Sequence, residues 1–131
     1  NACFGRFYFR DWEKMEKVRK GRYEDLFELL RDSSAKIYEA NFTCSPFVFP
    51  IGVKNVDEAA SRLQQRGVEI RTLMGGAMHK HPAFKHLENN DLKNTEHIGS
   101  SHFFVGIHQT IAEEHHRQVK TILREVLYGM A

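Results

Sequence analysis

Three short apolar runs limit the folds open to this chain. They read FVFPIGVK, VEIRTL and HFFVGIH and cover residues 47–54, 68–73 and 102–108. β-Branched residues recur in each run and are joined by phenylalanines in the first and third, as is typical of strands. Pro50 in the first run has no N–H to donate to a neighbouring strand, so we expect that strand at an edge of the sheet or at a bulge.

The segments between these runs have the spacing of amphipathic helices. Asp11 is placed to cap a first helix ending near residue 31, and Asn55 a second over residues 56–66. Thr110 and Glu113 have the spacing of a capping box for a third helix, which ends near residue 128. The order α-β-α-β-loop-β-α predicts an α/β (α+β) fold. We expect a two-layer sandwich in which helices cover one face of a small three-stranded sheet.

The stretch between the second and third runs shows no convincing long element over residues 74–101. Glycine, histidine, asparagine, proline and lysine are frequent in it. Loops of this length inside a compact domain are usually functional or disordered. The stretch opens with RTLMGGAMHKHPAFKH, Arg71 to His86, which is where we expect a functional site.

Composition and charge exclude several classes of protein. With 41% hydrophobic and 27% charged residues the chain has a globular composition. A net charge of +2 does not favour nucleic-acid binding, which calls for a clustered basic face. There is no signal peptide, no apolar run of membrane-spanning length, and no disulfide framework from Cys3 and Cys44. These features predict a cytoplasmic protein with reduced thiols and no membrane partner.

The residues of the loop leave several kinds of site open. His79 and His81, with His86 nearby, could ligate a metal, but no carboxylate completes a recognisable ligand pattern. Gly75 and Gly76 could expose backbone N–H groups to a phosphate, but neither full phosphate-loop motif is present. The glycines also suit a tight bend that approaches another surface. No nucleophile elbow or carboxylate pair is present, so we predict neither a metal site nor a catalytic residue on this chain.

The order of motifs resembles one enzyme family. FVFPIGVK, GVEIRTLMGGAMHKHPAFKH, NTEHIGSSHFFVGIHQTI and a last helix ending ILREVL resemble the C-terminal part of the DegT/StrS-type sugar-nucleotide aminotransferases, pyridoxal-phosphate enzymes of fold type I. The resemblance runs from about Trp12 onward. It is nearest to the branch of nucleotide 4-keto-6-deoxysugar 3-dehydratases of lipopolysaccharide biosynthesis. That branch has Asn where this chain has Ala77, and Gln where it has His81.

Further positions carry the same resemblance. Arg71 follows a strand, as an arginine does in that branch, and Asn94 to Glu96 stand where the branch has Asn-Thr/Ala-Asp. In the first helix, Arg22 and Asp25 fall where the family has arginine and asparagine.

The resemblance implies a set of substrate-binding residues in the loop. They are Arg71, Gly75, Gly76, His79, Lys80 and His81. The arginine would hold an anionic group, and the glycines would let the backbone approach the sugar. The first histidine would face the substrate, and Lys80 and His81 would contact the diphosphate or the sugar hydroxyls.

The family enzyme is much longer, which implies that residues 11–131 form its small C-terminal domain. Residues 1–10 would be a ragged start, with Asn1-Ala2 a scar of tag cleavage. The missing large domain would bind pyridoxal phosphate through a lysine, or in the dehydratases beside a histidine. The parent would be a homodimer acting on a nucleotide sugar, and this fragment would be inactive without bound cofactor. A stand-alone binding module with the same fold is the alternative.

Overall fold

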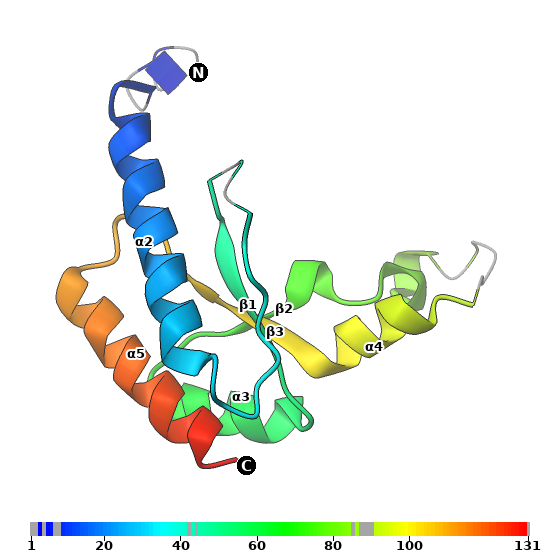
Figure 1. Ribbon diagram of the computed structural model, residues 1–131. Helices are drawn as coiled ribbons and strands as arrows, with labels where there is room; N and C mark the ends of the chain where they lie inside the picture. The colour runs from blue at the N-terminus through cyan, green and yellow to red at the C-terminus, as the bar shows by residue number, and fades with distance from the viewer. Residues whose placement is uncertain are drawn as a thin grey trace.

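The sheet has three strands, and the last strand in sequence lies in the middle. In the computed structural model, β1 (Val48–Gly52) and β2 (Arg71–Thr72) each pair antiparallel with β3 (His102–Gly106), in the order β1-β3-β2 (Figure 1). The three predicted strands and the α/β class are therefore confirmed. Pro50 lies in β1, an edge strand, where a residue without an N–H costs no ladder hydrogen bond.

The structure describes residues 3, 5–6, 9–41, 43, 45–84, 86 and 91–130. Asn1-Ala2 and Cys44 lie outside the described residues, and so the expectations for the tag scar and for this cysteine stay untested there. None of the helices in the described ranges is long and apolar enough to cross a bilayer.

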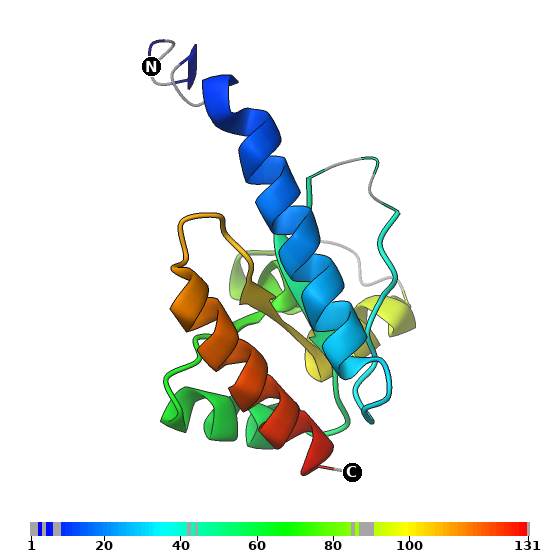
Figure 2. The ribbon, with the colours of Figure 1, turned by 60° about the vertical axis from the view of Figure 1, so that its left-hand side comes forward.

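Three helices cover one face of the sheet, as predicted. They are α2 (Trp12–Leu30), α3 (Val56–Gln65) and α5 (Glu113–Tyr128). A short 3-10 turn, η1 (Phe9–Asp11), precedes α2. Helices α2 and α5 run alongside each other in front of the sheet, and the N-terminal half of α2 projects past it (Figure 2).

The core lies between these helices and the alternate residues of the strands. Phe49 and Ile51 of β1 are paired with Val105 and Phe103 of β3, and all four side chains are almost completely buried. They pack with leucines of the helices, namely Leu26, Leu30, Leu63, Leu123 and Leu127. The other residues of the same strands, such as Phe104, face the opposite side of the sheet, because successive side chains alternate.

Of the three predicted helix caps, one is confirmed by a side-chain hydrogen bond. Asp11 stands at the N-cap position of α2, but its side chain makes no cap hydrogen bond among the described residues. Asn55 Oδ1 accepts a hydrogen bond from the Glu58 N–H at 3.1 Å, which confirms the cap of α3. The predicted capping box of α5 is wrong, because that helix begins at Glu113 behind Ala112. The Thr110 hydroxyl instead lies 2.7 Å from His108 Nδ1 within the preceding turn.

The expectation of no long element over residues 74–101 is also wrong. Helix α4 (Lys93–Ser101) leads directly into β3 and lies on the other side of the sheet from α2 and α5, as Figures 1 and 2 together show. None of its residues is buried, so it has no apolar stripe by which a sequence pattern could reveal it. Three 3-10 turns occupy the segment before it: η2 (Leu73–Gly75), η3 (Met78–Lys80) and η4 (Pro82–Phe84).

Candidate functional site

The candidate site is the segment from β2 to η3 together with α4, on the side of the sheet that α2 and α5 leave open. Arg71 of β2 is paired with Phe104 of β3 and is exposed. Its Nη2 and Nε lie 2.8 and 3.0 Å from Glu69 Oε1. The side chains of this pair are 70% and 76% exposed, so the ion pair is weak. The guanidinium can therefore exchange Glu69 for another anion at little cost.

A sharp bend follows β2. Met74, Gly75 and Gly76 have φ values of +50°, +83° and +79°, three successive residues in left-handed conformations. Glycine adopts such a conformation without strain, whereas a methionine there is uncommon. The predicted role of the glycine pair in making a tight bend is therefore seen directly in the backbone.

Beyond the bend, two loop side chains converge on one carboxylate of α4. Glu96 Oε1 lies 3.1 Å from His79 Nε2 and 3.2 Å from Lys80 Nζ. The hydrogen bond from His79 lowers the pKa of Glu96 most, followed by the hydrogen bond and charge of Lys80. The ionised carboxylate thus fastens η3 to α4.

His79 is the most enclosed of these side chains, with 11% of its side chain exposed. When Nε2 donates to the Glu96 carboxylate, Nδ1 is left as an acceptor. That nitrogen is buried and has no hydrogen-bond partner among the residues that the structure describes. A buried polar atom without a partner is costly, and it marks a place where a ligand or a change of loop conformation would supply a donor.

Gly99 lets α4 approach the bend closely. A Cβ at this position would lie 3.0 Å from the Ala77 nitrogen and 3.3 Å from its Cβ. The helix therefore touches the loop both through Glu96 and through the bare backbone of Gly99.

The six residues implied by the resemblance are thus only partly brought together. His79 and Lys80 share Glu96, and the bend at Gly75 and Gly76 leads into them. In the described part of the chain, neither Arg71 nor His81 bonds to this group. His81 is exposed, and its Nδ1 accepts a hydrogen bond from the Ala83 N–H at 3.3 Å.

Glu96 is the residue that sequence reasoning left out of the site. It stood in the Asn-Thr-Glu motif that carried the resemblance, but α4 was not expected, so nothing placed it beside the loop. Among the described residues, no three His, Cys, Asp or Glu side chains come together in a way that could hold a metal ion.

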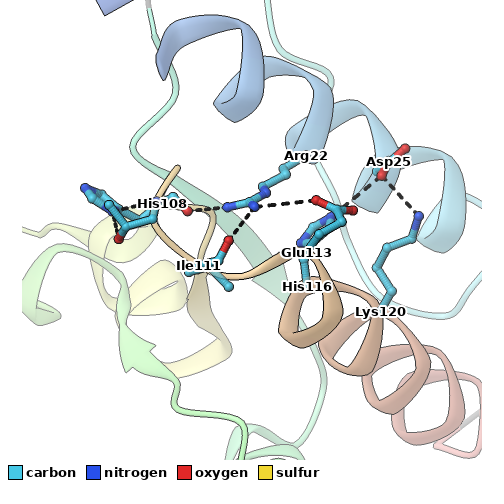
Figure 3. Close-up of polar contacts among 8 residues, drawn as sticks. Arg22, Asp25, His108, Ile111, Glu113, His116 and Lys120 are labelled. Carbon is cyan, nitrogen blue, oxygen red and sulfur yellow. Dashed lines mark hydrogen bonds and ion pairs between the residues drawn. The ribbon is translucent and has the colours of Figure 1, made fainter. Parts of the chain in front are cut away.

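A second polar cluster lies on the helix-covered side and has a structural role (Figure 3). Arg22 of α2 is 6% exposed and donates through Nη1 to the His108 carbonyl and through Nη2 to the Ile111 carbonyl, the latter at 2.7 Å. Glu113 Oε2 lies 3.6 Å from the same Nη2. The guanidinium therefore holds the connection between β3 and α5 against α2.

The same cluster continues along α2 and α5. Asp25 Oδ2 lies 3.1 Å from Lys120 Nζ and 3.6 Å from Nε2 of the buried His116. Burial lowers the pKa of His116, and the charge of Arg22 lowers it further. A neutral imidazole packed under an exposed ion pair indicates a structural contact between helices.

The sequence and the fold both match known proteins. The DegT/DnrJ/EryC1/StrS aminotransferase family matches residues 1–124. The aminotransferase TlmJ from Streptoalloteichus hindustanus superposes with a TM-score of 0.84 at 18% identity, over 96% of this chain and 35% of that one. No match was found among curated proteins.

Two further solved structures share the fold. DesV from S. venezuelae, in complex with a ketimine intermediate, gives a TM-score of 0.80 at 17% identity, over 92% of this chain and 34% of that one. The E. coli GDP-4-keto-6-deoxy-D-mannose-3-dehydratase with bound hydrated PLP gives 0.72 at 19% identity, over 88% and 32%. This chain spans about a third of the length of each of these proteins. Because the family match covers most of the sequence, the chain belongs to the DegT/DnrJ/EryC1/StrS aminotransferase family.

Proposed function

We propose that this chain is the small C-terminal domain of a pyridoxal-phosphate enzyme acting on a nucleotide-linked keto-deoxysugar. The observation that carries the proposal is the loop wall: a left-handed bend followed by His79 and Lys80, both fastened by Glu96 on the open side of the sheet. Family membership and a span of about a third of its structural neighbours support it. Under this proposal residues 11–131 are the domain and residues 1–10 an extension.

The loop wall does not by itself fit pyridoxal phosphate. Lys80 is the lysine of the wall, and its amino group is paired with Glu96. A Schiff-base lysine must be free to react with an aldehyde. We therefore assign the cofactor to the large domain of the parent enzyme and expect this chain alone to be inactive.

The chain's own residues would bind and orient the sugar nucleotide. Arg71 presents an exposed, weakly paired guanidinium, which suits a diphosphate. Gly75 and Gly76 carry no side chain that would keep a sugar from the backbone. His79, Lys80 and His81 offer donors and acceptors to sugar hydroxyls and phosphate oxygens.

The reaction itself would depend on one residue of the large domain. A lysine at the cofactor would give an aminotransferase, and a histidine a 3-dehydratase. The E. coli structural neighbour is a 3-dehydratase and TlmJ an aminotransferase, so both outcomes occur among proteins of this fold. We place the parent in the cytoplasm, as a homodimer in polysaccharide or lipopolysaccharide biosynthesis.

Two experiments test the proposal in turn. The gene upstream of the Asn1 codon should encode, in frame, a large domain with a lysine or histidine at the cofactor. If no such domain is encoded there, a stand-alone binding module with this fold replaces the proposal.

The second experiment uses the intact enzyme. Arg71→Ala should raise KM for the nucleotide sugar about ten-fold, the effect of losing one charged hydrogen bond to phosphate. Arg117→Ala, which removes an arginine from α5 on the covered side, should leave KM unchanged. Equal KM values for the two variants would reject a substrate contact by Arg71.

A further inference from the structure

A hollow of basic and hydroxyl side chains lies at the C-terminal end of α4. It has a volume of about 420 Å³, and the residues that give it its character are Lys36, Lys54, His97, His102 and three serines. None of these residues belongs to the loop wall. The hollow needs its own explanation because it contains no carboxylate among its lining residues.

Backbone hydrogen bonds fix the walls of this hollow. The Lys36 N–H donates to the Gly52 carbonyl at 2.7 Å, and the Gly52 N–H donates to the Lys36 carbonyl at 2.8 Å. The Val53 N–H donates to the Ser101 carbonyl at 2.8 Å. Backbone hydrogen bonds therefore hold together three segments that are distant in sequence. The main chain, and not contacts between side chains, fixes where these segments lie.

His102 forms the base of the hollow and is held in one state. Ser101 Oγ donates to the His97 carbonyl at 2.5 Å, so it accepts from His102 Nδ1 at 2.8 Å. His102 Nε2 is then an acceptor for the Tyr38 hydroxyl, at 2.6 Å. The imidazole is 2% exposed and neutral in this network, and its ring lies directly over Gly52.

The positive charges around the hollow lack counter-charges. In the described ranges, four lysines elsewhere each pair with a carboxylate: Lys20, Lys80, Lys93 and Lys120. Lys54 has no such pair there, and Lys36 Nζ has only the ring of Tyr38, 5.6 Å away. The pKa of His102 is lowered by burial first and then by the charges of His97 and Lys36, as a positive local field requires.

We propose that this hollow is a binding site for a phosphate group, held by Lys36, Lys54 and His97. Two ammonium groups and an imidazole without counter-charge among the lining residues attract a compact anion, and the adjacent serine hydroxyls add donors. A free phosphate and a phosphate ester both present such oxygens, so the site would accept either. The inference rests on this cluster alone and stands whether or not the proposed function does.

The test is an amide ¹H–¹⁵N NMR titration of the 131-residue chain with inorganic phosphate at constant ionic strength. The amide signals of Lys36, Gly52, Val53 and Ser101 should shift saturably, with a Kd of about 1 mM. The double variant Lys36→Gln/Lys54→Gln should weaken binding about five-fold, because each exposed ion contact contributes modestly. The double variant Lys93→Gln/Lys120→Gln makes the same change in net charge and is the control.

The outcomes of these titrations decide the matter. Selective weakening in the first variant supports the site. Equal weakening in both variants would indicate unspecific charge attraction and overturn the site. The absence of a saturable shift around the hollow would also overturn it.

Titration with a nucleoside diphosphate separates the two sources of phosphate. Binding that is tighter than that of inorganic phosphate, and is again weakened in the first variant, assigns the site to a phosphate ester. Binding of inorganic phosphate that the nucleotide does not exceed assigns it to the free anion.

Discussion

The two sides of the sheet are held by different kinds of force. On the helix-covered side, the core side chains of α2, α3 and α5 are nearly inaccessible, and even the charged Arg22 is buried against carbonyls. On the open side, α4 has no buried residue and is joined to the loop by Glu96 and by the close contact at Gly99. Burial makes the first side rigid, whereas the second depends on exposed polar contacts of small energy. The open side is therefore the one that can adjust to a ligand or to another domain.

The largest effect is expected on the covered side, from Arg22→Ala. Removing the guanidinium leaves the carbonyls of His108 and Ile111 without their charged donor. We expect the free energy of unfolding to fall by about 3 kcal/mol. Urea denaturation followed by circular dichroism measures it. Arg31→Ala removes two exposed ion pairs, with Glu28 and Asp32, and should cost no more than about 0.5 kcal/mol. If the two variants lose the same stability, burial of Arg22 against the two carbonyls is not what stabilises the covered side.

The second prediction concerns the contact between β1 and His102. A Cβ on Gly52 would lie 2.6 Å from His102 Nε2, and that ring is held at both nitrogens. Gly52→Ala should therefore cost about 2 kcal/mol through overpacking. Gly106→Ala in β3 is the matched control, because its nearest side-chain atom is Ile111 Cδ1 at 4.0 Å. That control should change stability by about 0.5 kcal/mol or less in either direction. A tolerated Gly52→Ala would show that His102 moves easily.

The third prediction is a loss of stability in mild acid. Burial lowers the pKa of both His102 and His116 below the usual 6.5. Below pH 6.5 these histidines bind protons more readily in the unfolded chain than in the folded chain. The stability that they contribute is therefore present above pH 6.5 and is lost as pH falls through their lowered pKa values in the folded state. The urea midpoint should be lower at pH 5.5 than at pH 7.5. His116→Asn should flatten this dependence, and a midpoint that rises on acidification would contradict the assignment.

The smallest effect on global stability is expected from Glu96→Gln. The hydrogen bond with His79 and the ion pair with Lys80 weaken, so the amides of η3 should exchange faster with solvent while the urea midpoint stays unchanged. In the unsubstituted chain, acid should speed the exchange of the η3 amides only below pH 4.5. The pKa of Glu96 is lowered from 4.5, so its contribution to stability is lost as pH falls through the lowered pKa. Asp91→Asn removes the exposed pair with Lys93 and should leave η3 as it was. Faster exchange throughout the sheet would mean that the loop contacts also support the core.

The same contrast explains what the sequence could predict. Strands and helices that bury a face carry a periodic apolar pattern, so β1, β3, α3 and the Asn55 cap were predictable from local residues. Helix α4 buries nothing and has no such pattern, and it was missed. The start of α5 was misplaced because the Thr110 hydroxyl bonds to His108 within the turn.

The candidate site was predictable only in part for a related reason. The resemblance directed attention to His79 and Lys80, and the glycine pair predicted the bend. Their common partner Glu96 depends on how α4 packs on the loop, which is a tertiary contact that no local pattern specifies. The substrate-binding roles of all six residues remain predictions.

The central claim is that the loop wall and α4 face the substrate, while the helix-covered side only supports them. Hydrogen exchange of the intact enzyme, with and without its nucleotide sugar, tests this directly. The account predicts slower exchange on binding in residues 71–81 and in α4, with α2 and α5 unchanged. Slower exchange confined to α2 and α5, with none in the loop wall, would contradict it.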